Sequence, residues 1–367
     1  MDLKKISLIQ FKNYEQLDLD FCPKINCFVG NNGAGKTNLL DAIFYLSLTK
    51  SYFNTIDTQN IMFDKEFFII QGEYDRDGTK ENIYCGVKKG RKKQFKRNNK
   101  EYKKLAEHIG LFPVVMISPS DSNLVLEGSD ERRKFLNAVI SQYDREYLND
   151  LMKYNRALVQ RNVLLKDFSR SGHYDKEMIE LWTEQMIPLG ENINKTRQKF
   201  VKELIPIFQT YYKTISTGQE EVSLEYQSQL NDVDFRQLLG DSQDKDRVLQ
   251  YTTAGIHKDD LNFTISGYPL KKNGSQGQQK TFLVALKFAK FDFIKKVNGF
   301  TPILLLDDVF DKFDATRVEQ IIQLVADQHF GQIFITDTNR DRIGNILKKL
   351  SIDYKLFQVD QGEISEK

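Results

Sequence analysis

The strongest constraint on the fold is a glycine-rich stretch, GNNGAGKTN, at positions 30–38. It follows a short apolar run, INCFV, and precedes LLDAIFYLSL, whose apolar residues recur at helical spacing. A strand, a loop and a helix in this order are typical of the phosphate-binding turn of nucleotide-binding α/β proteins. The alternative is a glycine turn that binds nothing, which leaves the flanking strand and helix unexplained.

The stretch matches the pattern G-x-x-x-x-G-K-[ST] in full. Glycines let backbone N–H groups curl around a phosphate, Lys36 can reach the β- and γ-oxygens, and Thr37 offers a hydroxyl to Mg²⁺. We therefore expect ATP and Mg²⁺ as cofactors. The expected loop residues are Gly30, Asn31, Asn32, Gly33, Ala34, Gly35, Lys36, Thr37 and Asn38.

A second apolar run, PILLLDD at 302–308, predicts a buried parallel strand that ends in two carboxylates. Open α/β sheets bind ligands at the carboxyl ends of their strands. Asp307 is the expected partner of Mg²⁺, and Asp308 is placed to polarise an attacking water beside Lys36. The alternative is a strand that ends in a solvated acidic turn.

The overall charge is nearly balanced, with 53 basic and 51 acidic side chains and a formal net charge of +2. Attraction to a polyanion must therefore come from local patches. Three cysteines and four scattered histidines show no zinc spacing. No signal peptide or long apolar run is visible, so we expect a cytoplasmic protein without a membrane partner.

One local patch is strongly basic. The 17 residues from Lys88 to Lys104 contain ten Lys or Arg and a single Glu, with Phe95 and Tyr102 between them. This pattern favours contact with a DNA backbone, although an edge hairpin that uses lysines against aggregation is the alternative. The candidate DNA contacts are Lys88, Lys89, Arg91, Lys92, Lys93, Lys96 and Arg97, with a second cluster at Arg132 and Arg133.

Helical periodicity begins at Ser129, which is expected to cap a long amphipathic helix running past Leu158. A second periodic stretch runs from Met178 to Tyr211, with a kink expected at Pro188. Two helices of about 30 residues would form an antiparallel arm about 45 Å long. The expected division is an N-terminal half of a head at 1–125, a helical arm insert at 126–250, and a C-terminal half of the head at 251–367.

A turn, NGSQGQQKTF at 273–282, stands at the start of another apolar helix and shortly before the acidic strand. This order resembles the ABC-type ATPases and implies an α/β fold with mixed sheets. In that superfamily such a turn presents its hydroxyl and N–H groups to the γ-phosphate of ATP bound on a second protomer. The matching residues are Ser275, Gln276, Gly277 and Gln278, where Gln276 replaces the usual glycine. An ordinary capped helix is the alternative.

Several motifs together resemble the RecF family of DNA recombination and repair proteins: FKNYEQLDLDF, FVGNNGAGKTNLLDAI, SPSD, GSDERRKFL, AGIHKDDLNF, NGSQGQQKTFLVALKFAKF and LLLDDVFDKFD. The resemblance implies an ATP-driven homodimer that binds double-stranded and gapped DNA. It further implies that RecO- and RecR-type mediators act with it to load RecA in repair, replication restart and the SOS response. Slow DNA-dependent hydrolysis of ATP would reset the dimer.

Some positions depart from the family pattern. Lys12 and Lys258 stand where arginine is expected, and Ile256 where proline is expected. The loop after Asp308 reads VFDKF instead of a turn of small residues, and Asp311 is its candidate for a dimer contact. Transporter-type relatives carry a switch histidine after the next strand, where this sequence has no histidine, so Thr336 and Asp337 are the candidates for the switch. The alternatives are a clamp that holds ATP without cleaving it, a transporter-type ATPase, and an SMC-like protein, which would need a far longer coiled coil.

Overall fold

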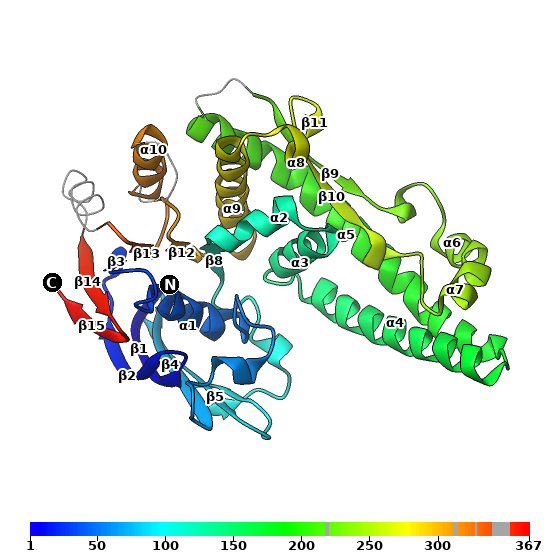
Figure 1. The fold of residues 1–367 in the computed structure, drawn as a ribbon, viewed down its shortest axis with the longest axis horizontal. Coiled ribbons are helices and arrows are strands. Elements are labelled where there is room, and N and C mark those ends of the chain that lie inside the picture. The colour runs from blue at the N-terminus through cyan, green and yellow to red at the C-terminus, as the bar shows by residue number, and fades with distance from the viewer. Residues whose placement is uncertain (217–219, 311–314, 327–328, 340–352) are drawn as a thin grey trace. The chain divides into compact units, whose positions relative to one another are not determined.

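The structure is a computed structural model, which describes residues 1–216, 220–310, 315–326, 329–339 and 353–367 (Figure 1). The chain forms two compact units. Unit 1 comprises residues 1–121, 214–218 and 283–367, and unit 2 comprises residues 122–213 and 219–282. The first boundary lies near the expected one at 125, whereas residues 251–282, expected in the head, cluster with the inserted unit.

Unit 1 contains an antiparallel sheet in the order β2-β1-β4-β5-β6-β7. Its strands are β1 (Asp2–Phe11), β2 (Tyr14–Asp20), β4 (Phe67–Arg76), β5 (Thr79–Lys88), β6 (Gln94–Arg97) and β7 (Lys100–Glu101). Buried and more exposed residues alternate along β4 and β5, as they do in a sheet with one face on the core. The run FFIIQGEY begins β4, and the run NIYCGVK ends β5.

The second sheet of unit 1 has the order β15-β14-β3-β13-β12-β8. Its strands are β3 (Ile25–Val29), β8 (Val114–Ile117), β12 (Ile303–Asp307), β13 (Ile333–Asp337), β14 (Tyr354–Asp360) and β15 (Glu363–Glu366). All are parallel except β15, which pairs antiparallel with β14. Every residue of β3, β8, β12 and β13 is buried, which is why these strands are mostly apolar in sequence.

Helix α1 (Lys36–Leu48) follows β3 and shares one hydrophobic core with residues of both sheets. Only Thr37 and Asn38 of its 13 residues are not buried. The helix is therefore enclosed on nearly all sides, and its buried residues are not confined to one face. Unit 1 also contains α10 (Ala315–Ala326) and most of α9 (Gln276–Asn298), whose first turns belong to unit 2.

Unit 2 combines helices with a small antiparallel sheet in the order β11-β10-β9. The strands are β9 (Val222–Gln227), β10 (Asp260–Ile265) and β11 (Tyr268–Pro269). The helices are α2 (Asn123–Leu126), α3 (Ser129–Ile140), α4 (Arg145–Ser171), α5 (Lys176–Ser216), α6 (Phe235–Asp241), α7 (Gln243–Leu249) and α8 (Leu270–Asn273). Among the described residues there are also five short 3-10 turns: Asp57–Asn60, Leu105–Glu107, Pro119–Ser122, Gln229–Asn231 and Ile256–Lys258.

The expectation of one long helix from Ser129 is wrong. The segment forms α3 and α4, because Asp144 leaves the helical conformation and its side chain caps α4 by accepting from the Tyr147 N–H at 2.8 Å. Gly128, and not Ser129, occupies the N-cap position of α3. Helix α5 is longer than expected, at 41 residues, and continues through Pro188.

Helices α4 and α5 run antiparallel, as expected for the arm (Figure 1). The Tyr147 hydroxyl near the start of α4 accepts from Arg197 Nε at 3.0 Å, whereas Arg161, further along α4, donates to Thr183 at 3.2 Å. Arg197 is 1% exposed and also donates to Asp259 at 2.6 Å. This buried pair ties the AGIHKDD segment to α5.

Within the described ranges, no helix is both long and apolar enough to cross a bilayer.

Candidate functional site

The loop that follows β3 requires glycine at two positions. A Cβ on Gly30 would lie 2.2 Å from the Val359 carbonyl oxygen, closer than any real contact. Gly35 has a φ of 116°, and a Cβ there would lie 2.4 Å from the Asn13 side-chain nitrogen. Both positions are therefore closed to other residues, and the loop is pressed between two neighbouring segments of the chain.

Lys36 is nearly buried, with 3% of its surface exposed, and its ammonium group is held above the loop. Its Nζ donates to the carbonyl oxygens of Gly30 at 2.8 Å and Asn31 at 3.0 Å. Asn31, Asn32 and Gly33 are exposed at the crest of the loop. The geometry therefore presents a cation and a solvent-facing row of backbone groups at the start of α1, which suits a polyphosphate.

Two residues at the β1–β2 turn also support the loop, although sequence reasoning assigned them no role. Asn13 Nδ2 donates to the Ala34 carbonyl at 3.2 Å, and Asn13 Oδ1 accepts from Asn38 Nδ2 at 2.7 Å. The Tyr14 hydroxyl donates to the Gly35 carbonyl at 2.9 Å. The only sequence signal was the run FKNY, since these hydrogen bonds link positions about twenty residues apart.

The two residues expected to hold Mg²⁺, Thr37 and Asp307, are in direct contact. Thr37 Oγ1 donates to Asp307 Oδ1 at 2.8 Å, and Thr336 Oγ1 donates to the same oxygen at 2.9 Å. Asp307 is 3% exposed, and burial raises its pKa to about 6, with the nearby Asp308 adding to the rise. The hydrogen bonds and Lys36 oppose that shift. A hydroxyl and a buried carboxylate at this distance fit Mg²⁺, which prefers oxygen ligands.

Asp308 is partly buried and has a φ of 45°, a conformation that costs energy in a non-glycine residue. Its backbone N–H donates to Thr336 Oγ1 at 2.9 Å, so Thr336 holds both residues of the acidic strand end. Thr336 lies there because it pairs with Asp307 across parallel strands β13 and β12. Its buried position suits a supporting role better than a switch that moves with the nucleotide.

Asp337 is 1% exposed, and its backbone carbonyl accepts from the Gly30 N–H at 3.4 Å. Its carboxylate accepts from the Asn339 N–H at 2.6 Å. The residue therefore holds the beginning of the phosphate loop. Asp311, the third candidate for a switch or dimer-contact role, lies outside the described residues.

The turn at 273–278 lies in unit 2 and caps α9 in a reciprocal way. The Gln278 N–H donates to Ser275 Oγ at 3.2 Å, and the Ser275 N–H donates to Gln278 Oε1 at 2.7 Å. This is a capping box in which glutamine occupies the third helical position. Ser275 and Gln276 are not buried, and Gly277 and Gln278 also retain contact with solvent.

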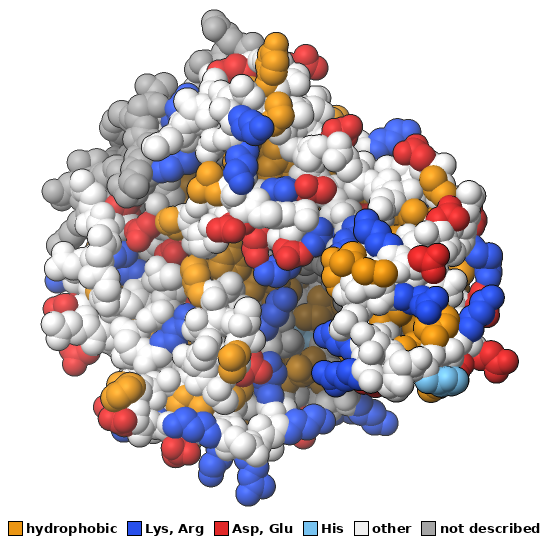
Figure 2. All heavy atoms as spheres, turned by 45° about the vertical axis from the view of Figure 1, so that its right-hand side comes forward, with side chains coloured by type: hydrophobic (Ala, Val, Ile, Leu, Met, Phe, Trp, Pro, Cys, Tyr) orange, Lys and Arg blue, Asp and Glu red, His pale blue; other side chains and the backbone are white. Residues whose placement is uncertain are grey.

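The basic segment forms the β5–β6–β7 edge of the antiparallel sheet, and Figure 2 shows lysine and arginine side chains gathered along the lower edge of its view. Not every candidate is available to DNA. Lys93 pairs with Asp57 at 2.7 Å and donates to the Thr49 carbonyl at 2.8 Å. Arg97 holds Glu81 with two nitrogens. The exposed basic candidates are Lys88, Lys89, Arg91 and Lys92.

The two aromatic residues in this segment do not face solvent as base-stacking groups would. Phe95 is 1% exposed and belongs to the core, and the Tyr102 hydroxyl lies 3.0 Å from Nδ1 of the buried His108. Lys96 is partly buried, with its ammonium 5.3 Å from the centre of the Tyr84 ring. The strand pleat turns Phe95 of β6 inward, so the lysines and arginines remain the candidate DNA contacts of this segment.

Arg132 and Arg133 of α3 are occupied within unit 2. Arg132 grips Asp260 with two nitrogens at 2.6 and 2.9 Å, and also donates to two backbone carbonyls. Arg133 donates to the Asp259 carbonyl at 2.6 Å and pairs with Asp130. These contacts give both arginines a structural role.

The two lysines that replace expected arginines are also engaged. Lys12 forms a 2.6 Å ion pair with the fully buried Asp41 of α1. Lys258 lies with its Nζ 4.9 Å from the centre of the Tyr251 ring. Neither lies on the phosphate loop itself.

Comparison with known proteins gives a consistent result along the whole chain. The RecF/RecN/SMC N terminal domain family matches residues 2–364. The DNA replication and repair protein RecF of Bacteroides thetaiotaomicron is 53% identical over 367 residues, which cover 100% of this chain and 99% of that protein. The corresponding protein of Flavobacterium johnsoniae is 48% identical, covering 98% of this chain and 100% of that protein.

Solved structures agree. A structure of the recombination mediator protein RecF-ATP in the RecFOR pathway matches with a TM-score of 0.90 at 29% identity, over 100% of this chain and 97% of that one. An Smc head domain from Pyrococcus furiosus matches with a TM-score of 0.57 at 15% identity, over 100% of this chain and 95% of that one, which concerns the fold alone. The architecture is that of an ABC-type ATPase head with an inserted, mostly helical unit.

Proposed function

This chain belongs to the RecF family, and from that premise we propose that it is an ATP-dependent, DNA-binding mediator of recombination. The observation that carries the proposal is the meeting of Lys36, Thr37 and Asp307 at one edge of the parallel sheet. Loop, cation, hydroxyl and carboxylate are the parts that bind a nucleoside triphosphate with its metal.

In the proposed site the N–H groups of residues 30–38 surround the phosphates, and Lys36 exchanges its two carbonyl partners for phosphate oxygens. Thr37 and Asp307 would hold Mg²⁺, which neutralises charge on the β- and γ-phosphates when bound. Asp307 must be ionised to do so. The hydrogen bonds from Thr37 and Thr336 favour that form and so support the assignment.

Asp308 is the proposed residue that orients the attacking water. Aspartate is shorter than the glutamate that is usual at this position in fast ATPases of the ABC type, and the backbone of Asp308 is already strained at a φ of 45°. We therefore expect slow hydrolysis, which resets the protein and is not its main output. A clamp that holds ATP without cleaving it would differ only in this step.

The proposed response to ATP is a symmetric dimer in which the turn at Ser275–Gln278 faces the γ-phosphate on the partner. ATP would favour the dimer because only that state completes the contact. The capping box supports this role, since the Gln278 side chain orients Ser275 at a helix N-terminus that solvent can reach.

The proposed ligand of the dimer is double-stranded or gapped DNA, with the exposed residues of the β5–β6–β7 edge among its contacts. RecO- and RecR-type mediators are the proposed partners, and loading of RecA is the proposed outcome. The solved relative described as a mediator of the RecFOR pathway supports this assignment.

Sedimentation velocity of an Asp308→Asn protein, with and without ATP and a 30-base-pair duplex, tests the proposal. Ser275→Asp and Ser275→Asn form a matched pair, because both residues cap helices but only aspartate repels a phosphate. We expect ATP to convert the Asp308→Asn and Asp308→Asn/Ser275→Asn proteins to dimers that carry DNA. The Asp308→Asn/Ser275→Asp protein should bind ATP and stay monomeric.

If all three proteins bind ATP and stay monomeric, the turn at Ser275–Gln278 only caps the helix and does not contact ATP on a partner. Release of phosphate by the wild type, followed over hours, separates slow hydrolysis from a non-hydrolysing clamp.

A further inference from the structure

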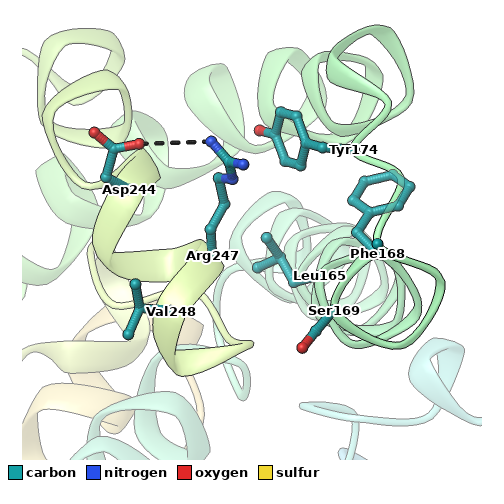
Figure 3. A pocket seen from close by; sticks show the side chains of 8 residues that line it. Leu165, Phe168, Ser169, Tyr174, Asp244, Arg247 and Val248 are labelled. Carbon is teal, nitrogen blue, oxygen red and sulfur yellow. Dashed lines mark ion pairs between the residues drawn. The ribbon is translucent and has the colours of Figure 1, made fainter.

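A pocket in unit 2 takes no part in the proposed nucleotide and DNA sites. It lies where the end of α4 approaches α7 and has a volume of about 520 Å³ (Figure 3). That size falls in the range of sites that hold a small ligand or a few side chains. All of its lining residues lie within unit 2.

One wall of the pocket is apolar. Leu165 is 2% exposed at its base, and the Phe168 ring packs edge-on against Tyr174 with 5.3 Å between ring centres. Val248, on the opposite side, is 79% exposed, and the adjacent Leu249 is 41% exposed. Valine and leucine at such exposure gain free energy when another apolar group covers them.

The pocket is also lined by the cation of Arg247, whose orientation is set by Tyr174. The Arg247 guanidinium carbon lies 4.4 Å from the centre of the Tyr174 ring, and the Tyr174 hydroxyl accepts from Gln243 Nε2 at 2.7 Å. The tyrosine is therefore fixed, and stacking aligns the guanidinium with it.

Arg247 has only a loose partner. Its nearest carboxylate oxygen, on Asp244, is 3.8 Å away, beyond hydrogen-bond distance, and the Asp244 side chain is 98% exposed. Among the residues that the structure describes, Arg247 makes no hydrogen bond through its side chain. Its donors are thus open to a planar acceptor, and a carboxylate matches the fork of a guanidinium best.

We propose that this pocket binds a peptide segment of a partner protein. An aromatic or aliphatic side chain of the peptide lies against Leu165, Phe168 and Val248, and a neighbouring carboxylate pairs with Arg247. A hydrophobic anchor beside one charge-assisted contact is the usual composition of a peptide-binding hot spot.

Nucleic acid fits this pocket less well. The segments that build it, 165–177 and 241–251, contain five basic and six acidic residues, so they offer no excess of positive charge to a phosphate backbone. The basic residues are Lys166, Arg170, Lys176, Lys245 and Arg247, and the acidic ones are Asp167, Asp175, Glu177, Asp241, Asp244 and Asp246.

Two small probes test the proposal on the full-length protein: N-acetylphenylalanine, which has a carboxylate, and N-acetylphenylalaninamide, which has none. Saturation-transfer NMR titrations measure binding of each. We expect the amide to bind about tenfold more weakly than the acid, because it cannot form the charge-assisted pair. Arg247→Gln should reduce binding of the acid to the level of the amide.

Two further variants separate the pocket from general charge effects. Lys245→Gln removes an exposed cation from the same helix and should leave binding of the acid unchanged. Val248→Asp, at an exposed position, should weaken binding of both probes without unfolding the protein. Equal binding of acid and amide, or binding of the acid that survives Arg247→Gln, would overturn the proposal. A 12-base single strand that binds only when Arg247 is intact, while the acid does not bind, would assign the pocket to nucleic acid instead.

Discussion

Single side chains from distant parts of the chain hold the acidic strand end and the phosphate loop in place. Thr336 donates to Asp307 and accepts from the Asp308 N–H, although about thirty residues separate it from both. Asn13 connects to the loop at Ala34 in the same manner. At this scale the site depends on hydrogen-bond partners that hold its charged groups, as much as on the charged groups themselves.

The first glycine of the loop offers a direct test. Gly30→Ala would place a methyl group 2.2 Å from the Val359 carbonyl oxygen, and backbone on both sides leaves little room to adjust. We expect ATP affinity, measured with a fluorescent nucleotide, to fall at least about tenfold, with a decrease of about 1–3 kcal/mol in stability. Gly33→Ala is the control, since nothing lies within 4 Å of its added methyl and only its φ of 80° opposes the change. Equal effects in the two variants would contradict the role of Val359.

His108 should make stability depend on pH. It is buried between the Tyr102 hydroxyl and the Leu46 carbonyl, 3.0 and 2.7 Å away, and burial lowers its pKa to about 4. The unfolded chain takes up the proton near pH 6.5, whereas the folded chain does so only near pH 4. The stability that neutral His108 contributes is therefore complete above pH 6.5 and declines as the pH falls toward 4.

Urea unfolding of the wild type and of His108→Gln at pH 7.5 and pH 4.5 measures this dependence. The wild type should lose about 2–3 kcal/mol more than the variant between the two values. His173→Gln, at an exposed position, should behave like the wild type. An identical pH dependence in His108→Gln would assign acid sensitivity to other groups.

The β5–β6–β7 edge shows that a basic segment can serve two purposes at the scale of one element. The strand pleat sends Phe95 of β6 into the core and leaves Lys88 at the end of β5 outside, and Lys92 is exposed in the loop between these strands. Lys93 and Arg97 are tied to carboxylates. Composition could locate the positive charge in this element. Only the pairing of the strands decides which charges remain available to a polyanion.

A triple variant of the exposed residues, Lys88, Arg91 and Lys92 to Gln, should weaken duplex binding. It should also lower the salt dependence of log K by about 0.9 for each phosphate that the protein no longer neutralises. Stability should change by less than about 0.5 kcal/mol per site. Fluorescence anisotropy at several salt concentrations measures both affinity and slope. The matched control changes three lysines of α5 that lie outside this edge, Lys195, Lys199 and Lys202, to Gln. An equal effect of both triples would move the DNA site away from the β5–β6–β7 edge.

Lys93→Glu, in contrast to the triple variant, should act mainly on stability. It removes the partner of Asp57 and places a like charge where the side chain is only 14% exposed, so we expect stability to fall by about 2–3 kcal/mol. Weaker DNA binding by this variant would then reflect unfolding, which circular dichroism detects. A stable Lys93→Glu protein would show that the pair with Asp57 contributes little.

At the scale of the whole molecule, the chain forms two compact units, and the helix α9 runs from one into the other. The phosphate loop and both carboxylates belong to unit 1, and the Ser275 turn belongs to unit 2. A ligand that binds only the folded form stabilises it by about 2.7 kcal/mol at about a hundred times its Kd. Bound ATP should therefore slow hydrogen exchange around the loop of unit 1. It should slow exchange at the Ser275 turn of unit 2 only when a dimer forms, because that turn would contact ATP on the partner.

Hydrogen exchange of the Asp308→Asn protein with and without Mg-ATP tests this expectation. Protection of residues 30–48 reports binding to unit 1, and added protection at 275–280 reports the contact with a partner. The added protection at 275–280 should vanish in the Asp308→Asn/Ser275→Asp protein, and also when the protein is diluted below the concentration at which it dimerises. The protection of residues 30–48 should remain in both cases. Protection at 275–280 that persists on dilution would be an effect within one chain.

The sequence by itself determined the position of the glycine-rich loop at 30–38 between a strand and a helix, because strand, loop and helix are neighbours along the chain and their residue types are dictated locally. It also located the acidic end of the strand at 303–307. It also determined two strands of the parallel sheet, β3 and β12, whose burial on both faces goes with mostly apolar runs. Tertiary structure alone decided the supporting partners Asn13, Tyr14 and Thr336, since strand pairing and loop packing bring them to the site from far along the chain. It decided the break at Asp144 as well, where a side-chain cap competes with a helical pattern that continues on both sides. The division of the basic residues into paired and exposed groups has the same origin: charge is a property of composition, but availability depends on which carboxylates the fold places within reach.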